Sequence, residues 1–221
     1  LVIASVTPGV QAAAEDDPLL YMLKVDQLEW RDGDEENFGS FKGYFWAGKD
    51  LNKLWIKSEI EGSEDETEKS EWQLLYSRAI DSNWDLQVGW RHDFKPEPER
   101  DWLAVGFNGI APYWFEINSA IFAEKDGQTN LRLEAEYEFM LTQKWVLSPE
   151  IEMNWFSKDD DDLDIGSGLA DLEAGLRLRY EITRQIAPYI GINYERLFGN
   201  TKDKVDAAGE ATSDTQALDG I

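Results

Sequence analysis

The stretch LRLEAEYEFML, residues 131–141, decides the fold, because apolar and polar side chains alternate along almost all of it. One face carries Leu131, Leu133, Ala135, Tyr137, Phe139 and Leu141. The other face carries Arg132, Glu134, Glu136, Glu138 and Met140. A period of two is that of a β-strand, whose successive side chains point to opposite faces, whereas a helix would scatter both sets around a cylinder. We therefore predict a strand with one apolar and one charged face.

The same alternation recurs from Leu20 onward and is equally regular in residues 84–91 and 171–182. Strands are expected near residues 20–31, 40–48, 53–61, 70–80, 84–93, 101–110, 113–123, 129–141, 145–156, 169–182 and 186–198. A final strand, which we expect to be truncated, begins near Thr215. These are about twelve strands, each close to the length that a tilted strand needs to cross a bilayer.

The connections between the expected strands alternate in length. The short ones span residues 49–52, 81–83, 111–112, 142–144 and 183–185, and the longer ones span 32–39, 62–69, 94–100, 124–128, 157–168 and 199–214. Outer-membrane barrels have short periplasmic turns and longer external loops. The chain is therefore predicted to be all-β, an antiparallel up-and-down transmembrane β-barrel in the outer membrane of a Gram-negative bacterium, with both termini periplasmic.

Alternation alone does not say which face of each strand points inward. A soluble barrel is apolar inside, whereas a membrane barrel is apolar outside. A ring of about twelve strands would enclose a lumen too wide for apolar side chains to fill, so we expect the apolar face to meet lipid. A soluble sandwich of two sheets is the structural alternative.

Composition narrows the functional classes. Aromatic residues make up 13% of the chain, with 10 Trp, and such residues favour bilayer interfaces. The mean hydropathy of −0.51 does not argue against a barrel, because only every second residue of a strand meets lipid. The net charge of −24 argues against nucleic acid as a partner and favours cations. The absence of cysteine excludes disulfides and thiolate metal sites.

The N-terminus has the pattern of a secretion signal. Residues 1–10 are mostly small and apolar, and Ala12-Ala13-Ala14 precedes an acidic run, as at a signal-peptide cleavage site. We expect residues 1–14 to be a signal-peptide remnant, residues 15–19 a short periplasmic segment, and residues 20–221 the barrel.

Several motifs in the expected strands resemble those of a known family. They are DQLEW (26–30), NKLW (52–55), LYSRAI (75–80), APYWFE (111–116), LRLEAEY (131–137), GSGL (166–169), DLEAGLR (171–177), APY (187–189) and YER (194–196). In this order they resemble the copper resistance protein B family, across essentially all of residues 20–221.

The resemblance implies an outer-membrane barrel that binds or moves copper ions in copper resistance or homeostasis. It implies outer-membrane lipid and lipopolysaccharide as surroundings, and a periplasmic copper-resistance protein as a possible partner. Many members carry a Met- and His-rich stretch before the barrel. Here only residues 15–18 separate the expected cleavage site from the first strand, so copper capture by such a tail is not expected.

Five residues are candidate copper ligands on the lumen face or at the periplasmic mouth: Met22, Asp26, Glu134, Glu136 and Met140. A thioether suits soft copper ions, whereas carboxylates prefer harder cations. A structural interpretation competes with this one. Rows of carboxylates commonly pair with cations across strands, here Arg91, Arg177 and Arg179, and a Met near a strand start commonly packs.

His92, the single histidine, continues the apolar set of Trp84, Leu86, Val88 and Trp90 and is expected on the outer wall near the external rim. A membrane hydrolase would need a serine beside it, and none is adjacent in sequence. No other stretch resembles a catalytic or cofactor motif. We expect a protein that is not an enzyme. The alternative to copper handling is a structural or general diffusion barrel.

Overall fold

The computed structural model describes residues 18–32, 37–63, 66–183 and 185–221. The predicted signal-peptide remnant lies outside these residues, as do residues 15–17 of the expected periplasmic segment. The strands are β1 (Leu20–Asp32), β2 (Asn37–Gly48), β3 (Asn52–Gly62), β4 (Thr67–Asp81), β5 (Trp84–Lys95), β6 (Arg100–Ala111), β7 (Phe115–Glu124), β8 (Thr129–Glu136), β9 (Phe139–Met140), β10 (Trp145–Phe156), β11 (Gly168–Tyr180), β12 (Tyr189–Leu197) and β13 (Ser213–Gly220). Two connections contain short helices, η1 (Pro112–Trp114) and α1 (Gly199–Ala208).

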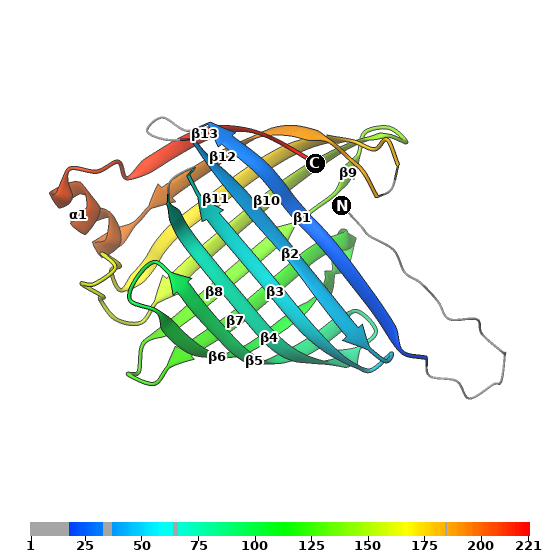
Figure 1. Ribbon diagram of the computed structural model, residues 1–221, viewed down its shortest axis with the longest axis horizontal. Coiled ribbons are helices and arrows are strands. Elements are labelled where there is room, and N and C mark those ends of the chain that lie inside the picture. The colour runs from blue at the N-terminus through cyan, green and yellow to red at the C-terminus, as the bar shows by residue number, and fades with distance from the viewer. Residues whose placement is uncertain (1–17, 33–36, 64–65, 184) are drawn as a thin grey trace.

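The strands form one closed antiparallel ring (Figure 1). β8 and β9 lie end to end along β10 and pair with it in the same register. They therefore act as one strand, and the ring has twelve strands. The break between them lies beside Pro149. The Tyr137 backbone N–H donates to the Pro149 carbonyl at 3.1 Å, but Pro149 has no N–H to donate in return. The predicted barrel is confirmed, and the alternative sandwich of two sheets is wrong.

The seam of the ring is formed by the last strand. β13 pairs with β12 along its whole length, but it pairs with β1 only at residues 29–32 of β1. The final strand begins at Ser213, close to the predicted Thr215, and four register pairs with β1 close the ring.

The two ends of the barrel differ in the length of their connections. At one end, turns of two to four residues join β2 to β3, β4 to β5, β6 to β7 and β9 to β10, and residues 181–188 join β11 to β12. The other end has four connections of four residues each and the two longest ones, residues 157–167 and 198–212. The second of these contains α1, which lies at the opposite end of the barrel from β9 in Figure 1. We call these the short-turn end and the long-loop end.

Polar side chains fill the interior, and apolar side chains cover the outside. Asn130 and Arg132 are 1% and 6% exposed, whereas Leu103 and Ile190 are 70% and 64% exposed. Apolar side chains on an outer wall are stable where they meet lipid, so the predicted orientation of the two faces is confirmed. Among the described residues, no helix is long and apolar enough to cross a membrane.

Part of the inner wall departs from the predicted alternation. Trp55, Leu75, Trp102, Ala104 and Phe122 form a buried apolar cluster on β3, β4, β6 and β7. The guanidinium groups of Arg91 and Arg132 lie 4.6 and 5.5 Å from the ring centroid of Phe122, within cation–π range. The lumen therefore combines ionic groups with an aromatic strip that holds two of its cations.

Candidate functional site

A cavity of about 910 Å³ occupies the short-turn half of the lumen. Its lining extends from Arg132 and Glu71 near the middle of the barrel to Gln143, Gln185 and Ala187 in the turns at the short-turn end. We call this cavity the vestibule. Because turn residues form part of its wall, solutes can reach it from that end.

The vestibule has more negative than positive side chains. Its carboxylates are Asp26, Glu59, Glu71, Glu116, Glu134, Glu136, Glu138, Glu150 and Glu181, and its cations are Lys24, Lys42, Lys57, Arg132, Arg177 and Arg179. The three lysines lie on β1, β2 and β3, whereas most of the acids lie on the facing wall, from β7 to β10. An excess of carboxylates in a walled cavity raises the local concentration of cations.

A charged septum lies at the inner end of the vestibule; it consists of Glu71, Arg91, Asp93, Arg132 and Glu152. Arg132 of β8 donates through both terminal nitrogens to Glu71 of β4, at 2.9 and 3.1 Å. Arg91 contacts the same Glu71 carboxylate at 2.9 Å and Asp93 at 2.7 Å. All five side chains are almost fully buried. Their ion pairs therefore bridge the lumen from wall to wall.

The predicted pairing of the carboxylate row with three arginines is confirmed for Arg179 alone, because Arg177 and Arg91 pair with carboxylates outside that row. Arg177 donates to Glu29 at 2.7 Å and to Glu150 at 2.8 Å, and Arg179 pairs with Glu138. Arg91 belongs to the septum. Much of the lumen charge is thus neutralised within the protein, as the structural interpretation expected.

One row of carboxylates is less completely neutralised. Glu116 of β7 lies directly opposite Glu136 of β8, and Glu136 lies directly opposite Glu150 of β10. Like charges in such positions repel each other. Glu150 is paired with Arg177 and Lys42, but within the described chain neither Glu116 nor Glu136 has an ion-pair partner within 4.0 Å. This acidic row is the part of the lumen best prepared to accept a mobile cation.

The structure brings four of the five predicted site residues together. Asp26, Glu134, Glu136 and Met140 all line the vestibule. Met140 is 75% exposed near the short-turn end, whereas Asp26 is already paired with Lys24 at 2.6 Å. Met22 is not among the lining residues and lies opposite Trp46 in the β1–β2 ladder.

Sequence reasoning missed Glu116, Glu150 and Lys42. Glu116 follows the turn at η1, and its importance comes from its position opposite Glu136, which only strand register reveals. Lys42 of β2 lies 3.4 Å from Glu150 and 3.8 Å from Glu134, both across the lumen. No local pattern in the sequence indicates such a bridge.

His92 lies on the outer wall, as its alternation predicts. Its Nδ1 is 2.8 Å from Asp101, and its ring lies against Trp90 and Phe94. Its neighbours in the ladders are Trp72 on β4 and Asp101 on β6. Neither is a serine, so the paired positions supply no nucleophile for the hydrolase hypothesis.

At the long-loop end, α1 is tied to the connection between β10 and β11. The Gly166 N–H donates to the Thr201 hydroxyl at 2.8 Å, and Asp159 accepts from the Ser167 N–H at 2.7 Å and from the Asn200 amide at 3.3 Å. The Ser167 N–H and the Asn200 amide lower the pKa of Asp159 below its usual range. The carboxylate form of Asp159 therefore helps to hold this loop in place.

Across the described ranges, no group of three or more His, Asp or Glu side chains is arranged to hold a metal ion. The vestibule thus offers separated carboxylates and one exposed thioether rather than a closed coordination cage. Separated oxygen donors bind a cation weakly, so an ion that enters can also leave.

Comparisons with known proteins agree with this architecture. The family model described as Copper resistance protein B precursor (CopB) matches residues 19–221. Copper resistance protein B of Escherichia coli is 44% identical over 198 residues, which are 90% of this chain and 67% of the relative. Copper resistance protein B homolog of Pseudomonas syringae pv. tomato is 38% identical over 197 residues, 89% of this chain and 67% of the relative.

Among solved structures, the NanC porin superposes with a TM-score of 0.60. The match covers 89% of this chain and 98% of the porin at 13% sequence identity. Likeness at so low an identity shows the fold alone, a porin-like barrel.

Proposed function

The chain belongs to the copper resistance protein B family, and from that premise we propose that it binds copper ions weakly in its vestibule and conducts them through the outer membrane. The observation that carries this proposal is the acidic row of Glu116, Glu136 and Glu150, set in a cavity that has more carboxylates than cations. Copper is the transported substrate in this proposal, not a resident cofactor.

The donor set supports transient binding rather than storage. Carboxylate oxygens are poor ligands for soft Cu(I) and adequate ones for Cu(II), whereas the Met140 thioether favours Cu(I). Met140 lies near the short-turn end and the acidic row lies deeper, so an entering ion meets sulfur first and carboxylates next. Several weak stations in series suit conduction better than one strong site.

The vestibule opens at the short-turn end of the barrel. Short turns face the periplasm in bacterial outer-membrane barrels. On that orientation the vestibule would collect copper from the periplasm, and the septum would separate it from the external half of the lumen.

The test uses the purified barrel reconstituted into lipid vesicles that contain a copper-sensitive dye. The double variant E116Q/E136Q should slow Cu²⁺ entry several-fold, because two unpaired carboxylates lose their charge. E210Q is the matched control, since Glu210 is exposed at the long-loop end. Equal entry rates in all three proteins, with normal heat-modifiable migration of the barrels, would remove the acidic row from the mechanism.

A general diffusion barrel is the second candidate, and the lack of a three-ligand group in the described residues favours it. Entry of Cu²⁺ and Mg²⁺ measured in the same vesicles separates the two functions. Similar rates for both ions indicate general diffusion. A preference for Cu²⁺ that decreases in M140L supports copper handling, because leucine keeps the volume but removes the sulfur.

A further inference from the structure

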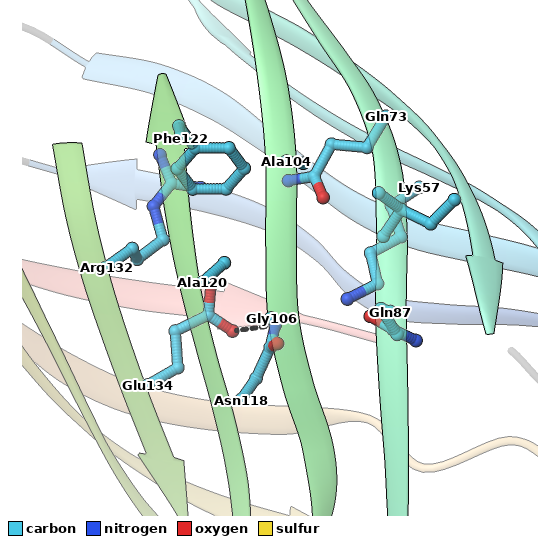
Figure 2. A pocket seen from close by; sticks show the side chains of 11 residues that line it. Lys57, Gln73, Gln87, Ala104, Gly106, Asn118, Ala120, Phe122, Arg132 and Glu134 are labelled. Carbon is cyan, nitrogen blue, oxygen red and sulfur yellow. Dashed lines mark hydrogen bonds between the residues drawn. The ribbon is translucent and has the colours of Figure 1, made fainter. Parts of the chain in front are cut away.

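A small recess opens from the vestibule on the wall formed by β3 to β8 (Figure 2). Its floor consists of Ala104, Gly106 and Ala120, whose small side chains leave the strands almost bare. Lys57 and Gln87 lie on one side of this floor and Glu134 on the other, as Figure 2 shows. Both Lys57 and Glu134 also line the vestibule, so the recess is continuous with it.

Lys57 is the unusual group in this recess. In the part of the chain that the structure describes, its ammonium has no hydrogen bond and no ion pair within 4.0 Å, and its nearest aromatic contact is Trp55, at 5.8 Å from the ring centroid. Lys42, one strand away on the same wall, reaches three carboxylates. A half-buried ammonium without an anion indicates a place where an external anionic group would be stabilised.

A second unsatisfied group lies beside Lys57. Gln87 is 4% exposed, and its amide nitrogen has no hydrogen-bond partner among the described residues. Buried polar groups are nearly always hydrogen-bonded, so an unpaired amide in a cavity wall calls for a missing partner. Lys57 and Gln87 together offer donors on one side of the recess.

Glu134 provides the opposite charge on the facing side. β3 and β8 are five strands apart in a ring of twelve, so Lys57 and Glu134 lie on nearly opposite walls. The two residues do not pair with each other. Glu134 accepts from the Asn118 amide at 3.2 Å and has Lys42 at 3.8 Å, and the second interaction is too long for a hydrogen bond.

From this juxtaposition we infer that the recess binds a small zwitterion of the α-amino acid type. The carboxylate of the ligand would accept from Lys57 and Gln87, and its ammonium would donate to Glu134. The recess itself has room of about 10 Å³, enough for one water-sized group. Only a carboxylate oxygen of the ligand would enter, while its ammonium and side chain would lie in the vestibule, which Glu134 also lines. A simple anion would be repelled by the surrounding acids, and a simple cation would leave Lys57 unpaired.

The test compares three ligands of the same size on the wild-type barrel in metal-free buffer at neutral pH, by ligand-observed NMR titration. Glycine carries both charges, glycolate only the carboxylate and ethanolamine only the ammonium. Glycine should bind about tenfold more tightly than either analogue, since each analogue lacks one of the two charged hydrogen-bonding groups. Equal affinities for all three compounds would overturn the assignment. This comparison does not depend on any variant assembling.

Variants then locate the ligand. K57M and E134Q should each weaken glycine binding about tenfold and abolish its advantage over the analogues. K53M is the matched control, because Lys53 lies on the same face of β3 but pairs with Asp85 at 3.4 Å. Glycine binding that survives K57M in an assembled barrel would show that the recess holds only water. Because no copper is present, the result is independent of the proposed conduction.

Discussion

Replacement of Arg132 by methionine tests whether the charged septum holds the barrel together. Methionine keeps much of the volume and removes the charge. Arg132 makes two hydrogen bonds to Glu71, at 2.9 and 3.1 Å, one to Asn154 at 3.2 Å, and an ion pair with Glu152 at 3.3 Å. Both acids are almost fully buried, so the variant leaves two carboxylates with less compensation.

The expected loss follows from these contacts. Removal of one partner from a buried ion pair costs about 3–5 kcal/mol. Glu71 keeps Arg91 at 2.9 Å, which places the loss near the lower end, about 3 kcal/mol. Every 1.4 kcal/mol changes an equilibrium about tenfold, so the unfolding constant should rise by roughly a hundredfold. With a urea dependence of about 2 kcal/mol per molar, the midpoint should fall by roughly 1.5 M.

The assay is urea unfolding of the barrel in lipid vesicles, followed by tryptophan fluorescence. The double variant E71Q/R132M is the informative control. It removes both charges of the bridge and should be less destabilised than R132M alone, because Glu152 is then the one buried carboxylate that loses Arg132, whereas R132M leaves both Glu71 and Glu152 without it. A loss below about 1 kcal/mol in R132M, or an equal loss in both variants, would refute the septum as a stabilising element.

Three further predictions concern other parts of the molecule. K42M should tighten Cu²⁺ binding by about fivefold or more, because a unit positive charge nearby costs a bound cation about 1 kcal/mol even in water. Equilibrium dialysis measures the Cu²⁺ affinity, and an unchanged affinity would contradict this prediction. H92F should leave copper entry into vesicles unchanged, since His92 lies on the outer wall; slower entry would assign it a role in the transport path. Loop 157–167 should become sensitive to limited proteolysis as the pH falls below about 4, and D159N should show that sensitivity at neutral pH. The direction of this pH effect follows from the lowered pKa of Asp159. Its carboxylate stabilises the folded loop at a pH above the pKa that Asp159 has in the unfolded chain, and that stabilisation is lost as the pH falls through the pKa in the folded protein.

Alternation predicted the orientation of most lumen residues correctly. Glu134 and Glu136 face inward because they share one side of a regular strand, and Met140 continues the same face in β9. The orientation of the whole barrel was also predictable, because about twelve strands cannot pack an apolar interior. These inferences need only the period with which apolar and polar residues alternate and an estimate of the number of strands.

Contacts across the ring were not predictable from one strand at a time. The β-bulge between Val25 and Gln27 changes the alternation of β1, so that Asp26 and Gln27 both line the vestibule. Beyond the bulge, the odd-numbered Glu29 is the buried residue. Bulges insert a residue without a strong sequence signal, and each one reverses the faces that follow. The lysine bridge from β2 to β10 depends on tilt and closure, which no local pattern encodes.

Stability and permeation are coupled in this lumen. The bridges that close it, from Arg132 to Glu71 and from Lys42 to Glu150, are ion pairs between distant strands and not between neighbours. A cation that passes must compete with Lys42 for the same carboxylates. Since a divalent ion carries twice the charge of the ammonium that it would displace, its net gain at equal distance is the Coulomb energy of one unit charge, whereas a monovalent ion gains nothing. The arrangement therefore favours divalent over monovalent cations even without a coordination cage. Vesicles loaded with equal concentrations of Cu²⁺ and K⁺ should show that preference. K42M removes the same competing unit charge for both ions, so both should enter more readily while their ratio stays close to that of the wild type. Equal permeation of the two ions through the wild-type barrel would contradict the argument.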